Sequence, residues 1–383
     1  MPEMKETKVL LAMSGGVDSS AAGKLLRDAG YDCVGCTMKL YENEDAGLSR
    51  SRTCCSLEDV EDARSAAFRL GIPYYVFNFT DAFREKVIGK FTASYCQGLT
   101  PNPCIDCNRY LKFGALFQRA ELLGCRYVAT GHYARIDCRD GRYHLRKARD
   151  ESKDQSYVLY MLSQDQLART LFPLGELRKE AVRDLAEEAG LGNARKPDSQ
   201  DICFVPDGDY ARVIEHQTGH AAEPGDFVSP EGTVLGRHQG LIRYTVGQHR
   251  GLGLSLPERR YVCRLCPESN TVVLGPEAAL YRREALTGDF HWIAGEPPAG
   301  PIRCRVKLRY RQREQDAEAV PLDGGAVRLR FDEPQRGRGP GRRHPPAGGL
   351  KTASPGASAP GLAYACFRSR SCPPGGCSGG LPG

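Results

Sequence analysis

Residues 8–20 read KVLLAMSGGVDSS, an apolar run that meets two glycines and then enters the helical pattern SAAGKLLRDAG. A strand that turns through glycines into a helix lets the backbone approach a ligand closely. The first amides of that helix, with the hydroxyls of Ser14, Ser19 and Ser20, face a place where the helix dipole favours an anion. The segment therefore predicts a phosphate site, with an ordinary glycine-rich turn as the alternative. The G-K-S/T ending of a kinase-type P-loop is absent, so no lysine reaches the β- and γ-phosphates from here.

The same alternation of short apolar runs and helical patterns continues to residue 205. We expect strands at KVLLAM, DCVGCTMKL, PYYVFNF, CRYVATGHY and DICFV, each apolar enough to be buried on both faces of a sheet. Helices are expected at 19–29 and 58–70, the second begun by Ser56 with Asp59 three residues on, a capping-box pattern. Alternating strands and helices imply an α/β fold with a parallel sheet.

The character of the chain changes after residue 205. Short alternating runs separated by Gly and Pro, such as YTVGQHRGLGL and IRCRVKLRY, predict small β-rich domains. From Gly337 onward the sequence is rich in Gly, Pro and Ser, and its few apolar residues cannot offset the entropy cost of ordering it. We therefore expect a catalytic domain at 1–205, a central domain at 206–280, a β-rich domain at 281–336 and a disordered tail at 337–383.

Length and charge limit the functions that this chain can have. It has 383 residues, long for one domain, and its net charge is +6. The tail from Gly337 holds six basic residues and no acid, so residues 1–336 carry 47 of each sign, which excludes a basic coat over the whole sequence. A membrane-spanning run of about 18 apolar residues is also absent. We expect no membrane partner and a cytoplasmic protein, whose 16 cysteines are reduced and serve packing, metal binding or catalysis.

Two cysteine motifs carry candidate chemistry. The first is TPNPCIDCN at residues 100–108, which places Cys107 near the start of a helix, where the dipole would lower the pKa of a thiol from about 8.5. The second is KPDSQDICFV at residues 196–205, which predicts Cys203 on an apolar strand behind a polar turn. Considered alone, Cys203 reads as a buried core cysteine.

These segments together resemble a known family. SGGVDSS, CCSLEDVEDA, TPNPCIDCN, ATGHYAR, KDQSYVLY, PDSQDICFV, YTVGQHRGLG, RYRQ and FDEPQR occur in the order found in the bacterial tRNA-specific 2-thiouridylases, over nearly all of residues 7–336. The resemblance implies an adenine-nucleotide hydrolase-like domain with the pyrophosphate loop of the N-type ATP pyrophosphatases, followed by small β-rich domains of which the last is a β-barrel. It also implies an enzyme that replaces the C2 oxygen of the wobble uridine of tRNA by sulfur. ATP adenylates that oxygen and leaves as AMP and pyrophosphate, Mg²⁺ assists, and the partners are the tRNA anticodon loop and a persulfide donor, either a sulfur-relay protein or a cysteine desulfurase.

The resemblance also assigns residues. Cys203 would carry the persulfide, and Cys107 would release the sulfur or resolve the intermediate, leaving a disulfide between the two. The residues implied to bind ATP are Ala12, Met13, Ser14, Gly15, Gly16, Val17, Asp18, Ser19, Met38 and Gly131. Those implied to contact tRNA are Asn102, Pro103, Cys104, His132, Lys153, Asp154, Gln155, Arg309 and Tyr310. Without the resemblance, Lys153 and Asp154 read as a solvated helix start.

A cationic stripe is predicted near the C-terminal domain. Basic residues alternate with apolar ones from Ile302 to Arg313, so a strand here would have one core face and one cationic face. The stripe could follow phosphates, or it could be the charged outer face of a barrel strand.

The sequence departs from the family pattern at two places. Where many relatives have an aspartate proposed as a general acid or base, this chain has Cys104, with Asp106 two residues later. Cys104, Cys107 and Cys203 could hold three irons of a four-iron four-sulfur cluster or a zinc ion, whereas the interpretation that we favour is two free catalytic thiols. Cys33, Cys36, Cys54 and Cys55 leave a weaker zinc possibility, and Cys263 and Cys266 are expected in a core.

The second departure follows FDEPQR, where the apolar strands that complete the family's barrel give way to the Gly- and Pro-rich tail. A shifted reading frame would produce this change, and the barrel would be left incomplete with an open edge. Two other functions therefore stay open: another adenylating synthetase with a pyrophosphate loop, and a tRNA-binding module without turnover.

Overall fold

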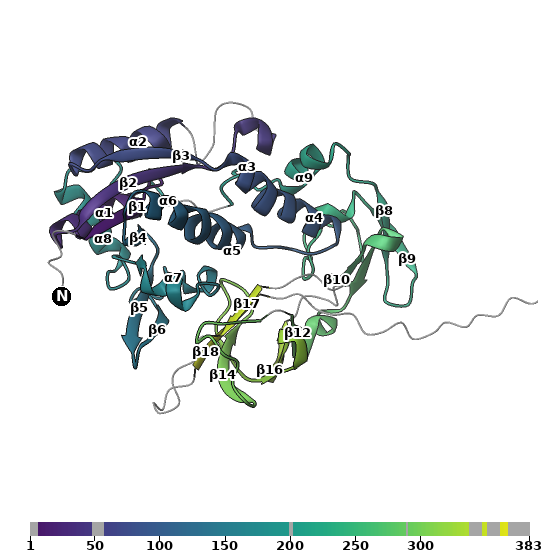
Figure 1. Ribbon diagram of the computed structural model, residues 1–383. Coiled ribbons are helices and arrows are strands. Elements are labelled where there is room, and N and C mark those ends of the chain that lie inside the picture. Colours follow the sequence, from purple (N-terminus) through teal and green to yellow (C-terminus); the bar gives the residue numbers. More distant parts are fainter. Residues whose placement is uncertain are drawn as a thin grey trace, which may run out of the picture.

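The computed structural model describes residues 7–47, 57–198, 202–288, 290–336, 347–350 and 361–366 (Figure 1). Its N-terminal part is built on a five-stranded sheet in the order β3-β2-β1-β4-β7. The strands are β1 (Lys8–Ala12), β2 (Asp32–Lys39), β3 (Tyr74–Asn78), β4 (Tyr127–Thr130) and β7 (Thr170–Leu171). All four pairings are parallel, which confirms the expected sheet.

Helices cover both faces of this sheet because its strands are apolar on both sides. One core joins Val9 and Leu11 to α1 (Val17–Asp28), α2 (Leu57–Arg69) and α8 (Lys179–Glu188). The other joins Leu10 to α4 (Lys90–Cys96), α5 (Pro103–Cys107), a π-helical stretch at Asn108–Ala115 and α6 (Leu116–Leu122). β1 lies between β2 and β4 in the sheet. From β1 the chain continues to β2 on one side, whereas β4 is followed by β7 on the other side. This change of direction leaves a crevice at the carboxyl ends of β1 and β4. The two helices predicted at 19–29 and 58–70 are confirmed as α1 and α2, and Ser56 lies outside the described residues.

One predicted strand is wrong. The run DICFV does not enter the sheet, because Ile202–Val205 form a turn in which the Val205 amide donates to the Ile202 carbonyl at 2.8 Å. Phe204 is buried against the rings of Phe83 and Phe91. The apolar residues of this run therefore anchor a turn, and the fifth strand is β7.

Shorter elements connect the N-terminal part. They are α3 (Thr80–Phe83), a π-helical stretch at Arg84–Gly89, the hairpin of β5 (Ala134–Arg139) and β6 (Arg142–Lys147), α7 (Gln164–Ala168) and α9 (Tyr210–Thr218). Among the described residues, no helix is both long and apolar enough to cross a membrane.

The central part is a four-stranded sheet in the order β10-β11-β8-β9. Its strands are β8 (Gly225–Val228), β9 (Val234–His238), β10 (Tyr261–Cys266) and β11 (Thr271–Gly275). Phe227, Val262 and Leu274 are fully buried in its core. Cys263 and Cys266 lie on β10 and are only partly buried, so they border this core rather than fill it.

The C-terminal part is a seven-stranded sheet in the order β12-β16-β15-β14-β18-β17-β13. Its strands are β12 (Tyr281–Thr287), β13 (Phe290–Trp292), β14 (Ile302–Lys307), β15 (Gln315–Pro321), β16 (Val327–Arg336), β17 (Ala347–Leu350) and β18 (Gly361–Cys366).

The prediction that residues 337–383 are disordered is wrong for β17 and β18, drawn in yellow in Figure 1. β18 pairs with β14, and β17 pairs with β13, both in parallel. Their backbones supply hydrogen-bond partners to β14 and β13, so these two strands are not left as the open edge that loss of the last strands would produce. The rest of the tail lies outside the described residues.

Candidate active site

A pocket of about 750 Å³ lies at the carboxyl edge of the N-terminal sheet. It is lined by the turn after β1, the end of β2, the start of α5, two segments on either side of α8, and the turn after β14. The predicted site residues that line it are Met13, Ser14, Gly16, Val17, Asp18, Met38, Pro103, Cys104, Cys107, Lys153, Asp154, Gln155, Cys203 and Tyr310. Segments that are distant in sequence thus meet at one cavity.

The turn after β1 has the geometry of a phosphate site. Gly15 has a φ of +77°, and a Cβ there would lie 2.4 Å from the Asp59 carbonyl oxygen, so only glycine fits. Ser19 Oγ accepts from the Ser14 amide at 3.1 Å and donates to the Gly16 carbonyl at 3.0 Å, which fixes the turn. Gly16 precedes α1 and offers no side-chain cap, so the first amides of this helix remain available to an anion, among the residues described.

Gly131 follows β4 and supports this turn from behind. A Cβ on Gly131 would lie 2.8 Å from the Asp18 carbonyl carbon and the Ser19 amide. Ala12, Gly15, Ser19 and Gly131 shape the site without lining the pocket themselves.

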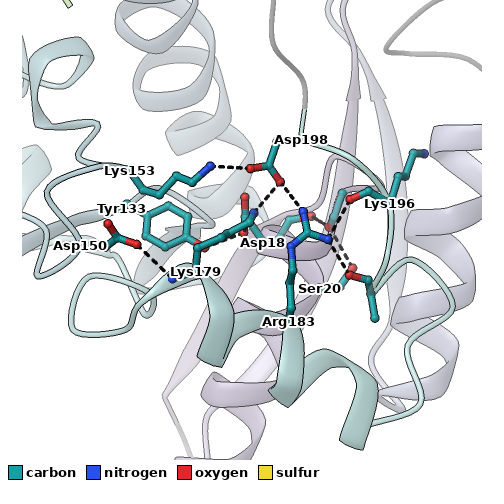
Figure 2. Close-up of polar contacts among 12 residues, drawn as sticks. Asp18, Ser20, Tyr133, Asp150, Lys153, Lys179, Arg183, Lys196 and Asp198 are labelled. Carbon is teal, nitrogen blue, oxygen red and sulfur yellow. Dashed lines mark hydrogen bonds and ion pairs between the residues drawn. The ribbon is translucent and has the colours of Figure 1, made fainter. Parts of the chain in front are cut away.

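Asp18 lies in the first turn of α1 and belongs to a network of charged side chains (Figure 2). Its Oδ1 accepts from the Tyr133 hydroxyl at 2.8 Å and from Lys179 Nζ at 2.6 Å. Lys179 Nζ also lies 2.8 Å from an oxygen of Asp198, and its side chain is only 7% exposed. Asp198 pairs in addition with Lys153 at 2.9 Å and Arg183 at 3.0 Å. We call Asp18, Lys153, Lys179, Arg183 and Asp198 the ionic cluster.

The ionic cluster changes the pKa of one of its members, Asp198, and of its neighbour Tyr133. Burial raises the pKa of Asp198, but the hydrogen bonds from Lys179 and Lys153 outweigh it and hold that pKa at about 2. The pKa of Tyr133 is raised, first by burial and then by the negative charge of Asp18. Tyr133 therefore stays a neutral hydroxyl that donates to Asp18.

The two predicted catalytic cysteines both line the pocket, where Cys107 is buried and Cys203 is partly exposed. The Tyr41 hydroxyl donates to the Cys203 carbonyl at 2.5 Å. Cys107 is the last residue of α5 and runs directly into the following helical stretch. The lowered pKa expected for Cys107 stays a prediction.

Cys104 lines the same pocket and is exposed to it, yet the enclosing protein keeps enough water away to raise the pKa of its thiol. Asp106 is 6% exposed and pairs with Lys90, away from the pocket lining. Asp106 thus lies outside the pocket, and the thiol of Cys104 has a raised pKa. No three metal-binding side chains gather anywhere in the described part of the chain, so the iron–sulfur and zinc alternatives are not supported.

The zinc alternative around Cys33 and Cys36 fails for a separate reason. The two residues lie on β2, where Cys33 packs into the core with α1 and Cys36 into the core on the opposite face of the sheet. Burial raises the pKa of Cys33 to about 11 and raises that of Cys36 further. Cys54 and Cys55 lie outside the described residues.

Three of the residues predicted to contact tRNA, Asn102, Pro103 and Cys104, lie at the start of α5. Asn102 Oδ1 accepts from the Cys104 amide at 3.1 Å, which caps the helix, and Pro103 occupies its first position. Pro103 and Cys104 line the pocket directly.

The other predicted tRNA contacts differ in their surroundings. Asp154 is 6% exposed and accepts from the Ala148 amide and the Ser156 hydroxyl. Gln155 Oε1 accepts from the Tyr133 amide at 3.0 Å. Both residues therefore hold the pocket wall together, whatever they contribute to tRNA.

His132 does not line the pocket. Its ring is buried between Phe113 and Phe172 and shares a 2.7 Å hydrogen bond with the Thr130 hydroxyl. Burial, with a smaller effect of Lys112, lowers its pKa well below the usual value. This position gives the predicted tRNA contact of His132 no support.

The cationic stripe is shorter than predicted. β14 ends at Lys307, so Arg309, Arg311 and Arg313 follow it in a turn rather than along a strand. Arg303 pairs with Asp332, and Arg305 pairs with Glu314, which neutralises part of the strand's outer face. Cationic side chains nevertheless reach the pocket from this end, where it is lined by Lys307, Tyr310 and Arg311.

Arg309 lies beside that wall. Its guanidinium donates to the Arg336 carbonyl at 3.3 Å. Tyr310 is 39% exposed and contacts the ring of Tyr157.

Several residues of the site were missed in the sequence, and four of them illustrate why. Tyr133 and Asp198 stand inside the quoted segments ATGHYAR and PDSQDICFV, so their position beside predicted residues was an available signal. Lys179 and Tyr41 stand in no motif, and only the fold brings Lys179 to Asp18 and Tyr41 to the Cys203 carbonyl.

Comparison with known proteins identifies related chains. Residues 7–207 match the family described as the tRNA methyl transferase HUP domain, residues 212–276 its PRC-barrel domain, and residues 282–343 the aminomethyltransferase beta-barrel domain. These matches confirm the expected fold class, an α/β domain with a parallel sheet followed by β-rich domains of which the last is a β-barrel.

Full-length relatives are similar over most of the chain. A tRNA-specific 2-thiouridylase MnmA from Clostridium acetobutylicum is 46% identical over 329 residues, which cover 86% of this chain and 93% of that relative. One from Acetivibrio thermocellus is 47% identical over 342 residues, with coverages of 88% and 95%.

Solved structures are more distant. A 4-thiouridine synthetase in complex with RNA and bound ATP aligns at 19% identity and a TM-score of 0.35, over 52% of this chain and 45% of that one. The NMN synthetase of Francisella tularensis aligns at 18% identity and a TM-score of 0.32, over 57% and 79%. Neither likeness is close enough to carry an argument about this chain.

Proposed function

This chain belongs to the family of the tRNA-specific 2-thiouridylases, and from that premise we propose that it replaces the C2 oxygen of the wobble uridine of tRNA by sulfur at the expense of ATP. The observation that carries the proposal is the pocket itself. It joins the glycine turn after β1 to Cys107 and Cys203, so an activating nucleotide and a pair of thiols would share one cavity.

The glycine turn would hold the nucleotide. The amides of Ala12 to Ser19 suit the phosphates, and Met38 and Gly131, which end or follow neighbouring strands, would frame the adenosine. The uridine C2 oxygen would attack the α-phosphorus, and pyrophosphate would leave with the electron pair of the broken phosphorus–oxygen bond. AMP then becomes the leaving group that the C2 carbonyl otherwise lacks.

Asp18 suits Mg²⁺, because an ionised carboxylate beside serine hydroxyls provides the hard oxygen ligands that this ion prefers. When bound, Mg²⁺ would neutralise charge on the phosphates. Tyr133 and Lys179 donate hydrogen bonds to the Asp18 carboxylate and fix its direction.

The thiols would complete the reaction. A persulfide on Cys203 would deliver its outer sulfur to C2 while AMP departs, and Cys107 would attack the inner sulfur of Cys203. This attack either frees the outer sulfur as hydrosulfide beforehand or resolves the intermediate afterwards. Both routes leave a disulfide between Cys107 and Cys203, which an external thiol would reduce before the next persulfide arrives from a sulfur-relay protein or a cysteine desulfurase.

The target base would come from an anticodon loop, where unpaired bases can be turned outward into a protein pocket. Asn102, Pro103 and Cys104 would meet the base, since the latter two line the cavity and Asn102 caps their helix. Lys153, Asp154, Gln155, Arg309 and Tyr310 would flank it.

The test is mass analysis of tRNA nucleosides after incubation of the chain with tRNA, Mg·ATP and a persulfide source. We expect 2-thiouridine, together with pyrophosphate release that depends on tRNA. Release that depends instead on a small carboxylate would favour another adenylating synthetase, and binding of tRNA without any release would favour a tRNA-binding module.

A further inference from the structure

The helix that begins at Pro103 changes its winding directly after Cys107. α5 ends at Cys107, and Asn108–Ala115 continue it as a π-helical stretch. In an α-helix, a residue five positions on lies about 140° further around the axis. In a π-helix each hydrogen bond spans five residues, so the side chain five positions on returns nearly to the same side. The π-helical winding therefore turns Lys112 towards the side of Cys107.

Lys112 lines the active-site pocket, as Cys104 and Cys107 do. Its neighbours in the sequence, Leu111 and Phe113, are fully buried in the core, so the base of its side chain is fixed. Lys112 itself is half-buried and forms part of the cavity wall. Its position in the pocket is thus set by the fold and not by a flexible loop.

The charge of Lys112 has no carboxylate within ion-pair distance in the part of the chain that the structure describes. Two other lysines of the pocket are paired, Lys153 with Asp198 and Lys196 with Asp59. An ammonium in a partly enclosed pocket is costly to leave without a counter-charge. Lys112 is therefore suited to bind an anion that enters this pocket.

The charge of Lys112 acts on the cysteine end of the pocket. Burial raises the pKa of the Cys104 thiol, and the ammonium of Lys112 opposes this effect in part. Burial lowers the pKa of His132, and Lys112 lowers it further, so His132 adds no positive charge of its own. Asp106, between the two cysteines, pairs with Lys90 away from the pocket lining. Lys112 is thus a source of positive charge beside the thiols.

The transferred sulfur is a free anion in one of the two routes of sulfur transfer. The Cys107 thiolate attacks the inner sulfur of the Cys203 persulfide, and a disulfide forms between the two cysteines. The bond between the persulfide sulfurs breaks, and its electron pair stays on the outer sulfur, which leaves as hydrosulfide. Cys107 is oxidised and the outer sulfur is reduced. The hydrosulfide then attacks C2, AMP departs with the electron pair of the carbon–oxygen bond, and the sulfur-bound proton passes to water.

We propose that Lys112 is a catalytic residue of the sulfur-transfer step: its ammonium forms a subsite for a small sulfur anion and holds the hydrosulfide between the cysteines and C2 of the activated uridine. The inference rests on the proposed function and deepens it, because it selects free hydrosulfide over direct transfer from the persulfide. It also gives the π-helical stretch a role, since the five-residue spacing brings the ammonium to the thiols.

The first experiment measures the electrostatic potential at Cys104 in the full chain, without ATP, tRNA or sulfur. Iodoacetate and iodoacetamide have nearly the same size and both react with the thiolate, but only iodoacetate is an anion. The ratio of their rate constants at one thiol therefore reports the local potential and does not depend on the pKa of that thiol. Mass spectrometry of the labelled peptides gives the ratio at Cys104 and, as an internal reference, at the exposed Cys138 on β5.

Lys112→Met should lower the ratio of iodoacetate to iodoacetamide reactivity at Cys104 about fivefold, the order expected for the loss of one charge in a partly enclosed site. The ratio at Cys138 should not change, and Lys112→Arg should keep most of the parental ratio at Cys104. Lys86→Met removes an exposed ammonium that pairs with Glu85 outside the pocket lining, and this matched control should behave as the parent. The other cations of the pocket stay in place in every variant, so a change in the ratio belongs to Lys112.

The second experiment measures 2-thiouridine formation with sodium sulfide as the sulfur source, in the presence of tRNA and Mg·ATP. Lys112→Met should raise the KM for sulfide about fivefold and leave the KM for ATP unchanged, because only the sulfur anion loses its counter-charge. Lys112→Arg should restore most of the affinity for sulfide. A general disturbance of the pocket would instead change both KM values.

An unchanged reactivity ratio at Cys104 in Lys112→Met would overturn the proposal, and so would an unchanged KM for sulfide. If Lys112→Met does not fold, Lys112→Gln gives the same comparison. In the parent, a ratio at Cys104 no higher than that of N-acetylcysteine amide, a neutral free thiol, would overturn the proposal without any substitution. Alkylation needs no turnover, so a parent that forms no 2-thiouridine would contradict the proposed function, and the alkylation ratio would still decide on the anion subsite.

Discussion

The Tyr41 hydroxyl donates to the Cys203 carbonyl at 2.5 Å, across 162 residues of sequence. Tyr41 follows β2 shortly after Met38, and its ring stacks on Phe83, which in turn packs against Phe204. The segment that contains Cys203 is thus attached to the strand that would frame the nucleotide.

We expect Tyr41→Phe to lower 2-thiouridine formation severalfold while pyrophosphate release continues, because the ring stays packed and the hydrogen bond to the Cys203 carbonyl is lost. The unfolding free energy should fall by about 1 kcal/mol, the usual net value of one hydrogen bond. Single-turnover assays of the two steps provide the measurement. Tyr75→Phe, on an exposed ring of β3, is the matched control. Equal losses in both steps would contradict the assignment.

Asp18→Asn should abolish pyrophosphate release and leave tRNA binding largely intact. The substitution removes the carboxylate that would bind Mg²⁺ and leaves the buried Lys179 with Asp198 as its ionic partner. Pyrophosphate release and tRNA affinity are measured side by side. Release at the parental rate would remove Asp18 from the nucleotide site.

Cys203→Ser and Cys107→Ser should each lose thiolation and keep adenylation, since a hydroxyl neither holds a persulfide nor exchanges with one. Cys104→Ser should retain appreciable thiolation, as its neighbouring thiols do the chemistry. Nucleoside analysis checks all three variants. A Cys203→Ser variant with full activity would contradict the sulfur-transfer mechanism as a whole.

Arg309→Ala should weaken tRNA binding and lower the slope of its salt dependence by about one unit, the effect of one lost phosphate contact. Arg303→Ala is the matched control, because Arg303 already pairs with Asp332 on the outer face of β14. Binding isotherms over a range of salt concentrations give both slopes. If the slopes for Arg309→Ala and the parent are identical, Arg309 does not contact a phosphate, and its hydrogen bond to the Arg336 carbonyl gives it a structural role instead.

Asp198 should contribute to acid stability. Its folded pKa of about 2 lies below the ordinary value, so its contribution is present in full above about pH 5 and is lost as the pH falls towards 2. The shift corresponds to roughly 2 kcal/mol. The stability difference between the parent and Asp198→Asn should therefore shrink over this range in denaturant titrations. A difference that stays constant with pH would show that Asp198 is not held in this way.

The N-terminal fold could be predicted because its information is local. The strand, glycine turn and helix at residues 8–28 follow one another in the chain, and their order alone implies a parallel sheet. The turn at Ile202–Val205 could not be recognised, since apolar residues that anchor a turn look the same as those of a buried strand until Phe83 and Phe91 are known to receive Phe204.

Charge patterns were less informative than apolar ones. The alternation around β14 predicted its buried face correctly, but the end of the strand at Lys307 depends on the turn that leads to β15. Lys179 could not be found at all, because its partner Asp18 lies 161 residues away and a lysine at a helix start is ordinarily solvated. The strands β17 and β18 were missed because the Gly- and Pro-rich composition of the tail outweighed the short apolar run at Gly361–Cys366.

Cys33 and Cys36 point to opposite faces of the sheet from β2, so their reactivity can report the exposure of each face separately. Both thiols are buried in separate cores and have raised pKa values, so an alkylating reagent at neutral pH can reach each of them only when the helices that cover its face of the sheet move away. The labelling rate of Cys33 therefore measures opening towards α1, and that of Cys36 measures opening towards α5. Equal rates would mean that the domain opens as one cooperative unit, and unequal rates would identify the layer that detaches first.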